Sequence, residues 1–444
     1  EAYKYYFTGR EAAFRMHNQE AIGNFQEAVA LDSTFIEAYD ALARQYYFIG
    51  ETEAALQVIE RVKSFSYKLT EEKLLEILSL EALLREDWEL AVTYLNRLIN
   101  SHPENMKAHI DLGMVYYQRK LMYDEGISEF KKALKLDPQG VSHRTGFVYN
   151  VLGYAYFRKG ERDKALEAFE KYVSLLPNQA YPLTSIGDFY CMVGEYDASL
   201  LRLAQAVEIK PDYSLPYIYL GHTYLEKGMY SLAQDSYEKS LQLSISDAQK
   251  GAIYSYLGNL HFLSGEYDQA IGWCQQALDL NPQMIEAHWT LGRIYATSGI
   301  LAEAEDEVRK IKRLVEQTQT EEMKKYYHHL MGELNLSKDF FQEAVESFHR
   351  AAEIKSLEPA FYQSAVAMGY YRAGKLSRAM EQLESVLRIN PNYVPAHYLL
   401  GVIHEQEGRE AEARHHFAEY LRIWENADED LPQFVEVKKR IEEL

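Results

Sequence analysis

Residues 148–177 read VYNVLGYAYFRKGERDKALEAFEKYVSLLP, and this stretch decides the fold. In its first half, aromatic and leucine side chains recur three and four positions apart, which predicts an amphipathic helix with one apolar stripe. In its second half, Ala165, Phe169 and Tyr172 lie at i, i+4 and i+7 and predict a second helix with its own stripe. The small residue Gly153 lets the two backbones approach closely where the helices cross.

The same pattern recurs along the whole chain, in twelve copies mostly 34 residues apart. Residues 216–243 and 286–308 align with the first stretch on a glycine and, twelve positions later, an alanine. The small residue of the first helix is at Gly9, Ala43, Ser79, Gly113, Gly153, Gly187, Gly221, Gly258, Gly292, Gly332, Ala367 and Gly401. That of the second helix is at Ala21, Ala55, Ala91, Gly126, Ala165, Ser199, Ala233, Ala270, Ala304, Ala344, Ala379 and Ala413. Because a unit of two helices cannot bury its own stripe, the units are expected to stack on their neighbours.

These positions resemble the tetratricopeptide repeat. The family consensus is matched by Tyr149, Leu152, Gly153, Tyr156, Ala165, Phe169 and Pro177. Tyr172 departs from it, since the family usually has a second alanine there. The resemblance covers essentially the whole chain. It implies an all-α fold, a right-handed α-solenoid superhelix of about twelve helix-turn-helix repeats with a C-terminal capping helix.

Departures from the repeat predict the domain organisation. We expect residues 1–427 to form twelve units of one continuous superhelix and residues 428–444 to form the capping helix. Extra linker residues at 141–145 and 319–324 predict two soft joints, and the fourth copy carries one extra residue in its inter-helix turn near 121–124. Because residue 1 is Glu rather than Met, a further segment is expected upstream, and the natural end is expected close to residue 444.

The charge of the chain excludes several classes of partner. With 47 Lys and Arg against 67 Asp and Glu, the formal charge is −20, which argues against nucleic acid and against an anionic membrane surface. No apolar run approaches the roughly 18–20 residues of a membrane span, so we expect no direct membrane insertion. The two cysteines exclude a disulfide framework. We favour a cytoplasmic location and leave an extracytoplasmic one open, in case a membrane span lies upstream.

No constellation of residues predicts catalysis. The chain lacks the GxxxxGK[ST], GxGxxG and HExxH motifs. Cys191 and Cys274 are interpreted as unreactive thiols. The pairs His328-His329 and His415-His416 predict no metal site by themselves, because neighbouring helical residues point about 100° apart. We therefore expect a protein that is not an enzyme and that binds neither a metal nor a cofactor.

A second face of the first helices is the candidate binding surface. Positions 2, 5, 9 and 12 of each unit lie away from the packing stripe, and in the resembled family this face lines the concave groove together with position 13. Here it carries an aromatic residue in nearly every unit, which is typical of a binding surface rather than a solvated one. The candidate partner-binding residues are Tyr6, Tyr47, Phe48, Tyr117, Phe147, Asn150, Tyr154, Phe157, Arg158, Tyr181, His222, Phe262, Trp289, Arg293, Tyr326, Tyr371 and Tyr398.

Two groove chemistries of the resembled family do not fit these positions. The chaperone-tail clamp uses Lys at position 5, and no unit has it; the asparagine ladder of sugar-transferase superhelices needs Asn repeatedly at position 6, and no such ladder exists. The groove is therefore predicted to be aromatic and acidic. Such a groove suits an extended or helical protein segment with basic and apolar residues.

The sequence thus predicts a non-catalytic protein–protein interaction scaffold or sensor domain. The alternative is a small-ligand or glycan receptor, in which Tyr and Trp stack on a sugar, and self-association through the aromatic face is also left open. Three segments further resemble bacterial multi-domain proteins whose repeat array follows a protein kinase, a winged-helix regulator or a TolB-like domain. They are residues 1–12, 69–92 and 420–444. This second resemblance implies the sensing or docking half of a signalling protein.

Overall fold

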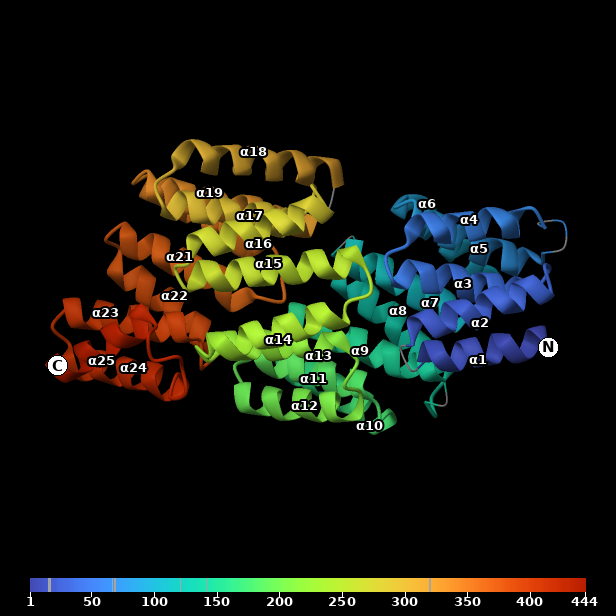
Figure 1. The fold of residues 1–444 in the computed structure, drawn as a ribbon, viewed down its shortest axis with the longest axis horizontal. Coiled ribbons are helices and arrows are strands. Elements are labelled where there is room, and N and C mark those ends of the chain that lie inside the picture. The colour runs from blue at the N-terminus through green and yellow to red at the C-terminus, as the bar shows by residue number, and fades with distance from the viewer. Residues whose placement is uncertain (15–16, 66, 68, 120, 141, 319–320) are drawn as a thin grey trace. The chain divides into compact units, whose positions relative to one another are not determined.

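The computed structural model describes residues 1–14, 17–65, 67, 69–119, 121–140, 142–318 and 321–444. All regular structure within these residues is helical, and the predicted all-α solenoid class is confirmed. Consecutive helices are joined by short turns and pack side by side in pairs (Figure 1). Among the described helices, none is long and apolar enough to cross a membrane.

The chain divides into two compact units, and the first comprises residues 1–179. Its pairs are α1 (Ala2–Phe14) with α2 (Asn18–Leu31), α3 (Ile36–Phe48) with α4 (Thr52–Lys63), α5 (Glu71–Leu84) with α6 (Trp88–Ser101), α7 (Met106–Met114) with α8 (Tyr123–Leu136), and α9 (His143–Arg158) with α10 (Arg162–Leu175). A π-helical segment, η2 (Val115–Arg119), continues α7.

Unit 2 comprises residues 180–444. Its pairs are α11 (Ala180–Met192) with α12 (Tyr196–Ile209), α13 (Ser214–Glu226) with α14 (Tyr230–Leu243), α15 (Asp247–Leu263) with α16 (Tyr267–Leu280), α17 (Ile285–Thr297) with α18 (Leu301–Thr318), α19 (Lys324–Ser337) with α20 (Phe341–Glu353), α21 (Pro359–Arg372) with α22 (Leu376–Ile389), and α23 (Val394–Gln406) with α24 (Glu410–Ile423). A 3₁₀ turn, η3 (Glu321–Met323), precedes α19, and α25 (Pro432–Glu443) ends the chain.

The small residues of the first helices allow each pair to cross closely. A Cβ atom added to Gly153 would lie 2.6 Å from the Phe169 ring, and one added to Gly221 would lie 2.3 Å from the Tyr237 ring. Real Cβ atoms do not approach other atoms this closely, so a larger residue would push the second helix away. The close approach that the sequence predicts at these positions is therefore present.

The turn within most pairs ends on a glycine in the left-handed region of the backbone. Gly160, with φ +77°, is one example. In three pairs this turn position carries another residue: Glu86 has φ 58°, Leu121 has φ 50° and Asp339 has φ 60°. A side chain costs roughly 1–2 kcal/mol in this conformation, so these three turns are less favourable than the others.

The extra residue of the fourth copy lies in a helix rather than in the turn where it was predicted. The segment Val115–Arg119 is π-helical and directly continues α7. A π turn bonds i to i+5 and so takes up one more residue per turn than an α-helix without breaking the backbone ladder. The insertion therefore widens the end of the first helix instead of lengthening the loop.

The two predicted joints overlap the undescribed part of the chain. Residue 141 of the first joint and residues 319 and 320 of the second lie outside the described residues. The boundary between the compact units lies elsewhere, after residue 179. Continuity of all twelve repeats in one superhelix stays a prediction.

The last helix, α25, buries its apolar stripe against the end of the final pair. Phe434 and Val437 belong to one core cluster with Phe417, Tyr420 and Trp424. The helix begins at a proline in its first turn, which fits because the missing N–H has no partner there in any helix. The preceding residues 428–431 form a loop rather than part of the helix.

Candidate functional site

In unit 1 the first-helix face carries a network of paired charges. Arg44 bonds Asp111 with Nη2 to Oδ2 at 3.0 Å, although an intervening pair separates α3 from α7. Lys107 of α7 donates from Nζ to Oδ2 of Asp40 in α3 at 2.9 Å. Burial raises the pKa of Asp40, but Lys107 and Arg44 outweigh it and hold this pKa well below its usual range. These charges satisfy one another, so a ligand here would have to displace an existing ion pair.

The exposed candidates of unit 1 are aromatic. Tyr47, Phe48 and Phe147 are 40%, 59% and 42% exposed. Tyr6 is half-buried, and its ring centroid lies 5.0 Å from that of Phe35. Exposed rings of this size are available to a partner.

The other candidates of unit 1 pack into the fold. Tyr117 and Phe157 are buried, and the Arg158 guanidinium carbon lies 5.5 Å from the centroid of the Tyr117 ring. Tyr154 is half-buried and packs edge-to-face on a phenylalanine of α10 at 5.0 Å. The side-chain carbonyl oxygen of Asn150 is buried without a hydrogen bond. This subset contributes packing even when no partner is present.

In unit 2 the structure groups three aromatic candidates with a fourth candidate, Arg293. The Arg293 guanidinium carbon lies 4.5 Å from the ring centroids of both Trp289 and Phe262 and 5.6 Å from that of Phe361. The Trp289 and Tyr326 centroids are 5.4 Å apart. Burial lowers the pKa of Arg293. We call these five residues the arginine cage; they come from α15, α17, α19 and α21.

Polar contacts hold the cage in place. Arg293 donates from Nη1 to Asn259 Oδ1 at 3.1 Å, and its Nε lies 4.0 Å from Glu333 Oε1. The indole N–H of Trp289 donates to His329 Nδ1 at 3.3 Å. Burial holds the pKa of His329 well below its usual value, so its ring is neutral and accepts this bond. The candidate set omits the cage residue Phe361 and its neighbour His329, although both lie on the predicted face.

The remaining candidates of unit 2 do not join the cage. His222 contacts the Tyr237 hydroxyl through Nδ1 at 2.7 Å, and burial lowers its pKa to about 4. Burial raises the pKa of Tyr181 to about 12. The Tyr371 hydroxyl accepts a bond from the Gln406 side chain, and the Tyr398 hydroxyl donates to a glutamate of α25. Tyr371 and Tyr398 thus bond to the last repeat and the capping helix.

Within unit 2, the last repeats also form hydrogen bonds with the first ones. Asn392 donates from Nδ2 to the Gly194 carbonyl at 2.9 Å, across 198 residues of sequence. Asn390 donates from Nδ2 to the Tyr196 hydroxyl at 3.1 Å. The same hydroxyl lies 3.3 Å from Glu226 Oε2 and 3.3 Å from the Asn392 carbonyl. The loop before α23 is therefore bonded to the turn between α11 and α12.

A second group of contacts completes the closure. The Trp424 indole N–H donates to the Glu226 carbonyl at 2.9 Å, and the Asp428 N–H donates to the Gly228 carbonyl at 3.0 Å. Ser231 donates from its N–H to Asp428 Oδ2 at 2.8 Å. A Cβ on Gly228 would lie 2.6 Å from the Trp424 ring, so only glycine fits there. We call both groups the closure contacts; they join α22–α24 to α11–α14, which lie side by side in Figure 1.

A buried histidine contact recurs in three repeats. His109 and His288 each contact a glutamate of the following helix through Nδ1, at 2.7 and 2.6 Å. At the corresponding place in the last repeat, His397 Nδ1 lies 3.1 Å from His416 Nδ1. Burial and the neighbouring histidines lower the pKa of His416 to about 3. The last repeat therefore holds a neutral pair where the other two repeats have a carboxylate.

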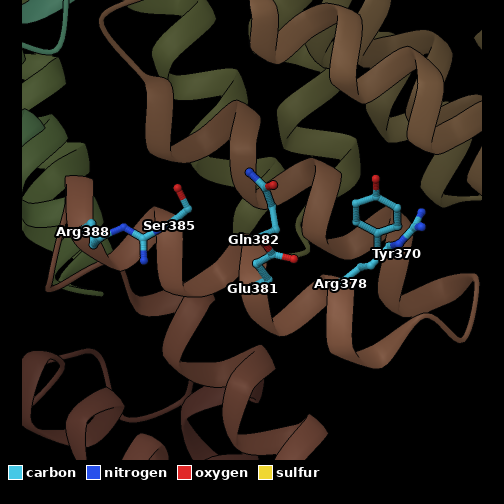
Figure 2. A pocket seen from close by; sticks show the side chains of 6 residues that line it. All are labelled: Tyr370, Arg378, Glu381, Gln382, Ser385 and Arg388. Atoms are coloured by element: carbon cyan, nitrogen blue, oxygen red, sulfur yellow. The ribbon is translucent and has the colours of Figure 1, made fainter.

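A surface pocket on α21 and α22 contains none of the candidates. It is lined by Tyr370, Arg378, Glu381, Gln382, Ser385 and Arg388, whose side chains Figure 2 shows along these two helices. The Arg378 guanidinium carbon lies 5.8 Å from the Tyr370 ring centroid. Within the described residues, no three His, Cys, Asp or Glu side chains are grouped so that they could hold a metal ion.

Comparison with known proteins settles the family. Family models described as Tetratricopeptide repeat match residues 78–141, 146–179, 217–244, 251–284 and 366–428, together about half of the chain. The chain belongs to the tetratricopeptide repeat family. Its repeats therefore continue through both compact units.

Curated relatives share this repeat region. The human Protein O-mannosyl-transferase TMTC1 is 24% identical over 49% of this chain and 24% of its own length. Superkiller protein 3 of Schizosaccharomyces pombe is 24% identical over 91% of this chain and 27% of its own length. The human Mitochondrial import receptor subunit TOM70 is 24% identical over 36% of this chain and 26% of its own length. The chain thus spans about a quarter of the length of these relatives.

Solved structures align along nearly the whole chain. The crystal structure of yeast Tom70 aligns with 100% of this chain and 95% of its own, at 15% identity and a TM-score of 0.41. An IFIT1 monomeric mutant with m7Gppp-AAAA aligns with 95% of this chain and 90% of its own, at 17% identity and a TM-score of 0.44.

Proposed function

We propose that this tetratricopeptide repeat array is a non-catalytic protein–protein interaction scaffold or sensor domain. Proteins of this family generally mediate protein–protein interactions, and the curated relatives include an import receptor subunit. The concave face binds an extended or helical segment that carries basic and apolar residues. The segment contacts the candidate aromatic residues along the first helices.

The arginine cage carries this proposal. Trp289, Tyr326, Phe262 and Arg293 are of the residue types enriched at interfaces, and they come from three successive repeats of unit 2. A segment lying across several first helices would therefore meet a rigid aromatic platform. The formal charge of −20 supports a basic partner over an acidic one or a nucleic acid.

A glycan or small-ligand receptor remains the alternative function. Stacking on a sugar needs a free ring face, yet the Arg293 guanidinium carbon lies 4.5 Å from the Trp289 centroid. This occupied ring favours a protein segment over a sugar. Thermal-shift screening separates the two, because a small ligand at a hundred times its Kd adds about 2.7 kcal/mol of stability.

The resemblance of residues 1–12, 69–92 and 420–444 to bacterial signalling proteins supports a cellular role. In that role the array is the sensing or docking half, and an effector domain acts on what it binds. A cytoplasmic location fits this role.

The test compares two tryptophans. Trp289→Ala removes the centre of the cage, whereas Trp273→Ala removes a half-buried tryptophan of the second helix α16, whose ring stacks on Tyr254 and His261 and not on a cage residue. Titration with labelled peptides that combine basic and apolar residues should show about thirtyfold weaker binding for Trp289→Ala, as expected of an interface hot spot. Trp273→Ala should bind as the unaltered protein does. Equal affinities of all three proteins would contradict the proposal.

A further inference from the structure

The surface pocket on α21 and α22 presents its charges in a fixed order. Its volume is about 310 Å³, and ligand-binding pockets occupy roughly 300–1,000 Å³. Five of its six lining residues lie on α22 at i, i+3, i+4, i+7 and i+10, and they therefore share one face of that helix. These are Arg378, Glu381, Gln382, Ser385 and Arg388. Along this face the charges run positive, negative, positive.

This face is separate from the surfaces already assigned. The other side of α22 packs into the fold through the buried Ala379, Leu383 and Val386. Arg378 and Arg388 are exposed. The helix α22 is the second of its pair, and none of the candidate residues on the first helices lines the pocket. The pocket is therefore a surface that the proposed function does not use.

Both arginines of the pocket are available to a ligand. Among the described residues, no carboxylate oxygen lies within 4.0 Å of a nitrogen of Arg378 or Arg388. Glu384 precedes Arg388 by four residues, which is the favoured spacing for an ion pair on a helix, yet the two do not pair. Asp40 and Arg44 have the same spacing and do pair, at 3.3 Å. The two guanidinium groups thus keep their donors for an anionic partner.

An aromatic ring holds the Arg378 end of the pocket. The Arg378 guanidinium carbon lies 5.8 Å from the centroid of the half-buried Tyr370 ring. The Tyr370 hydroxyl lies 2.9 Å from Nε2 of His349 on α20, and this contact fixes the ring. Figure 2 shows the Tyr370 and Arg378 side chains at one end of the pocket and the Arg388 side chain at the other. The two positive charges therefore mark the two ends of an elongated site.

The spacing of the charges fits an extended segment. Arg378 and Arg388 are ten residues apart, which is about 15 Å along the axis of a helix. In an extended chain, residues i, i+2 and i+4 share a face, and i and i+4 are about 13 Å apart. Two carboxylates at i and i+4 can therefore reach the two arginines. The side chain at i+2 lies between them, where Glu381 favours a lysine.

The net charge of the chain does not oppose an anionic segment at this place. At physiological ionic strength, exposed charges more than about 8 Å apart are largely screened from each other. The arginines that line the pocket therefore act on a ligand there more strongly than distant carboxylates do.

We propose that this pocket is a second protein-binding site, which takes an extended partner segment with two acidic residues four positions apart and a lysine midway between them. The acidic side chains pair with Arg378 and Arg388, and the lysine pairs with Glu381. Gln382 and Ser385 hydrogen-bond the backbone of the segment. The site goes beyond the proposed function, because it lies on a second helix and recognises a different charge pattern.

The experiment uses the full chain and two labelled peptides of identical composition. The matched peptide is Ser-Glu-Ser-Lys-Ser-Glu-Ser, and the permuted peptide is Ser-Lys-Ser-Glu-Ser-Glu-Ser. Binding is followed by fluorescence anisotropy at physiological salt. The proteins are the unaltered chain, the double variant Arg378→Gln/Arg388→Gln, the variant Glu381→Lys, and the control Arg313→Gln, whose residue is exposed on α18 and does not line the pocket.

The unaltered chain should bind the matched peptide at least fivefold more tightly than the permuted one, because only the matched order places every charge opposite its partner. The double variant should lose this preference, and Arg313→Gln should keep it. Glu381→Lys should reverse the central preference and bind Ser-Glu-Ser-Glu-Ser-Glu-Ser more tightly than the matched peptide. All variants should melt at the temperature of the unaltered chain, since the altered side chains are exposed.

Four results would overturn this site, and each leaves the proposed function of the first helices intact. The first is no binding of the matched peptide to the unaltered chain, and the second is equal affinity for the matched and permuted peptides. The third is an unchanged preference in the double variant. The fourth is a dimer of the unaltered chain that the double variant converts to a monomer in light scattering, which would assign the pocket to a second copy of the chain.

Discussion

Replacing Tyr196 by phenylalanine should loosen the closure of unit 2. The substitution keeps the ring and removes one oxygen, which accepts a hydrogen bond from Asn390 Nδ2 at 3.1 Å and lies 3.3 Å from both Glu226 Oε2 and the Asn392 carbonyl. Asn390 is buried, so water cannot easily replace the lost acceptor. Leaving such a donor unpaired costs about 1–3 kcal/mol.

This cost should appear as faster hydrogen exchange at the closure contacts. The Asp428 N–H bonds the Gly228 carbonyl only while unit 2 is closed. A penalty of about 1–3 kcal/mol makes opening roughly 5- to 150-fold more frequent, so peptides containing residue 428 should exchange faster by that factor. Mass spectrometry of deuterated peptides measures the change.

A matched variant controls for the loss of a tyrosine hydroxyl. Tyr217 donates its hydroxyl to the Pro211 carbonyl at 3.1 Å, only six residues away in sequence and near solvent. Tyr217→Phe should leave exchange near residue 428 unchanged. If Tyr196→Phe exchanges at the same rate as Tyr217→Phe at that position, the closure contacts do not hold unit 2 together, and the reasoning fails.

Three further predictions concern stability. Burial and the neighbouring histidines lower the pKa of His416 to about 3, so on acidification the unfolded chain binds this proton before the folded chain does. The free energy of unfolding should therefore fall as the pH drops from about 6.5 toward 3. Denaturant titrations at each pH should show a weaker dependence for His416→Gln. Gly221→Ala should destabilise by about 1–3 kcal/mol through its clash with the Tyr237 ring, whereas Gly272→Ala, which meets nothing within 4 Å on α16, should stabilise by up to about 1 kcal/mol; equal effects would refute the close crossing. Asp339→Gly should raise the melting temperature, because glycine adopts a φ of 60° without strain and gains about 1 kcal/mol there; a lower melting temperature would contradict this account of the turn.

Local periodicity predicts the helices and their crossings well. Each repeat encodes its two stripes and its small crossing residue within 34 positions, so Gly153 against Phe169 follows from spacing alone. The same spacing argument wrongly places the extra residue of the fourth repeat in the turn near residues 121–124. A length difference shows that one residue is added, but a π turn at Val115–Arg119 and a longer loop give the same count.

Contacts between distant repeats leave no periodic pattern of apolar or small residues in the sequence. Asn392 and Gly194 are separated by 198 residues, and nothing in the repeat pattern requires them to meet. The sequence predicts part of the arginine cage, because Trp289 and Arg293 are four residues apart on one predicted helix. The approach of Phe361 to Arg293 depends on how the repeats stack, and the sequence does not predict it.

The central claim is that a partner segment lies on the first helices of unit 2. Photo-cross-linking tests it most directly, with a labelled peptide of alternating arginine and leucine that carries a benzophenone group and with the adducts mapped by mass spectrometry. The account predicts adducts on α17, α19 and α21, around Trp289 and Phe361, and their loss in Trp289→Ala. Adducts confined to second helices such as α16 and α20, or to residues 1–179, would contradict it.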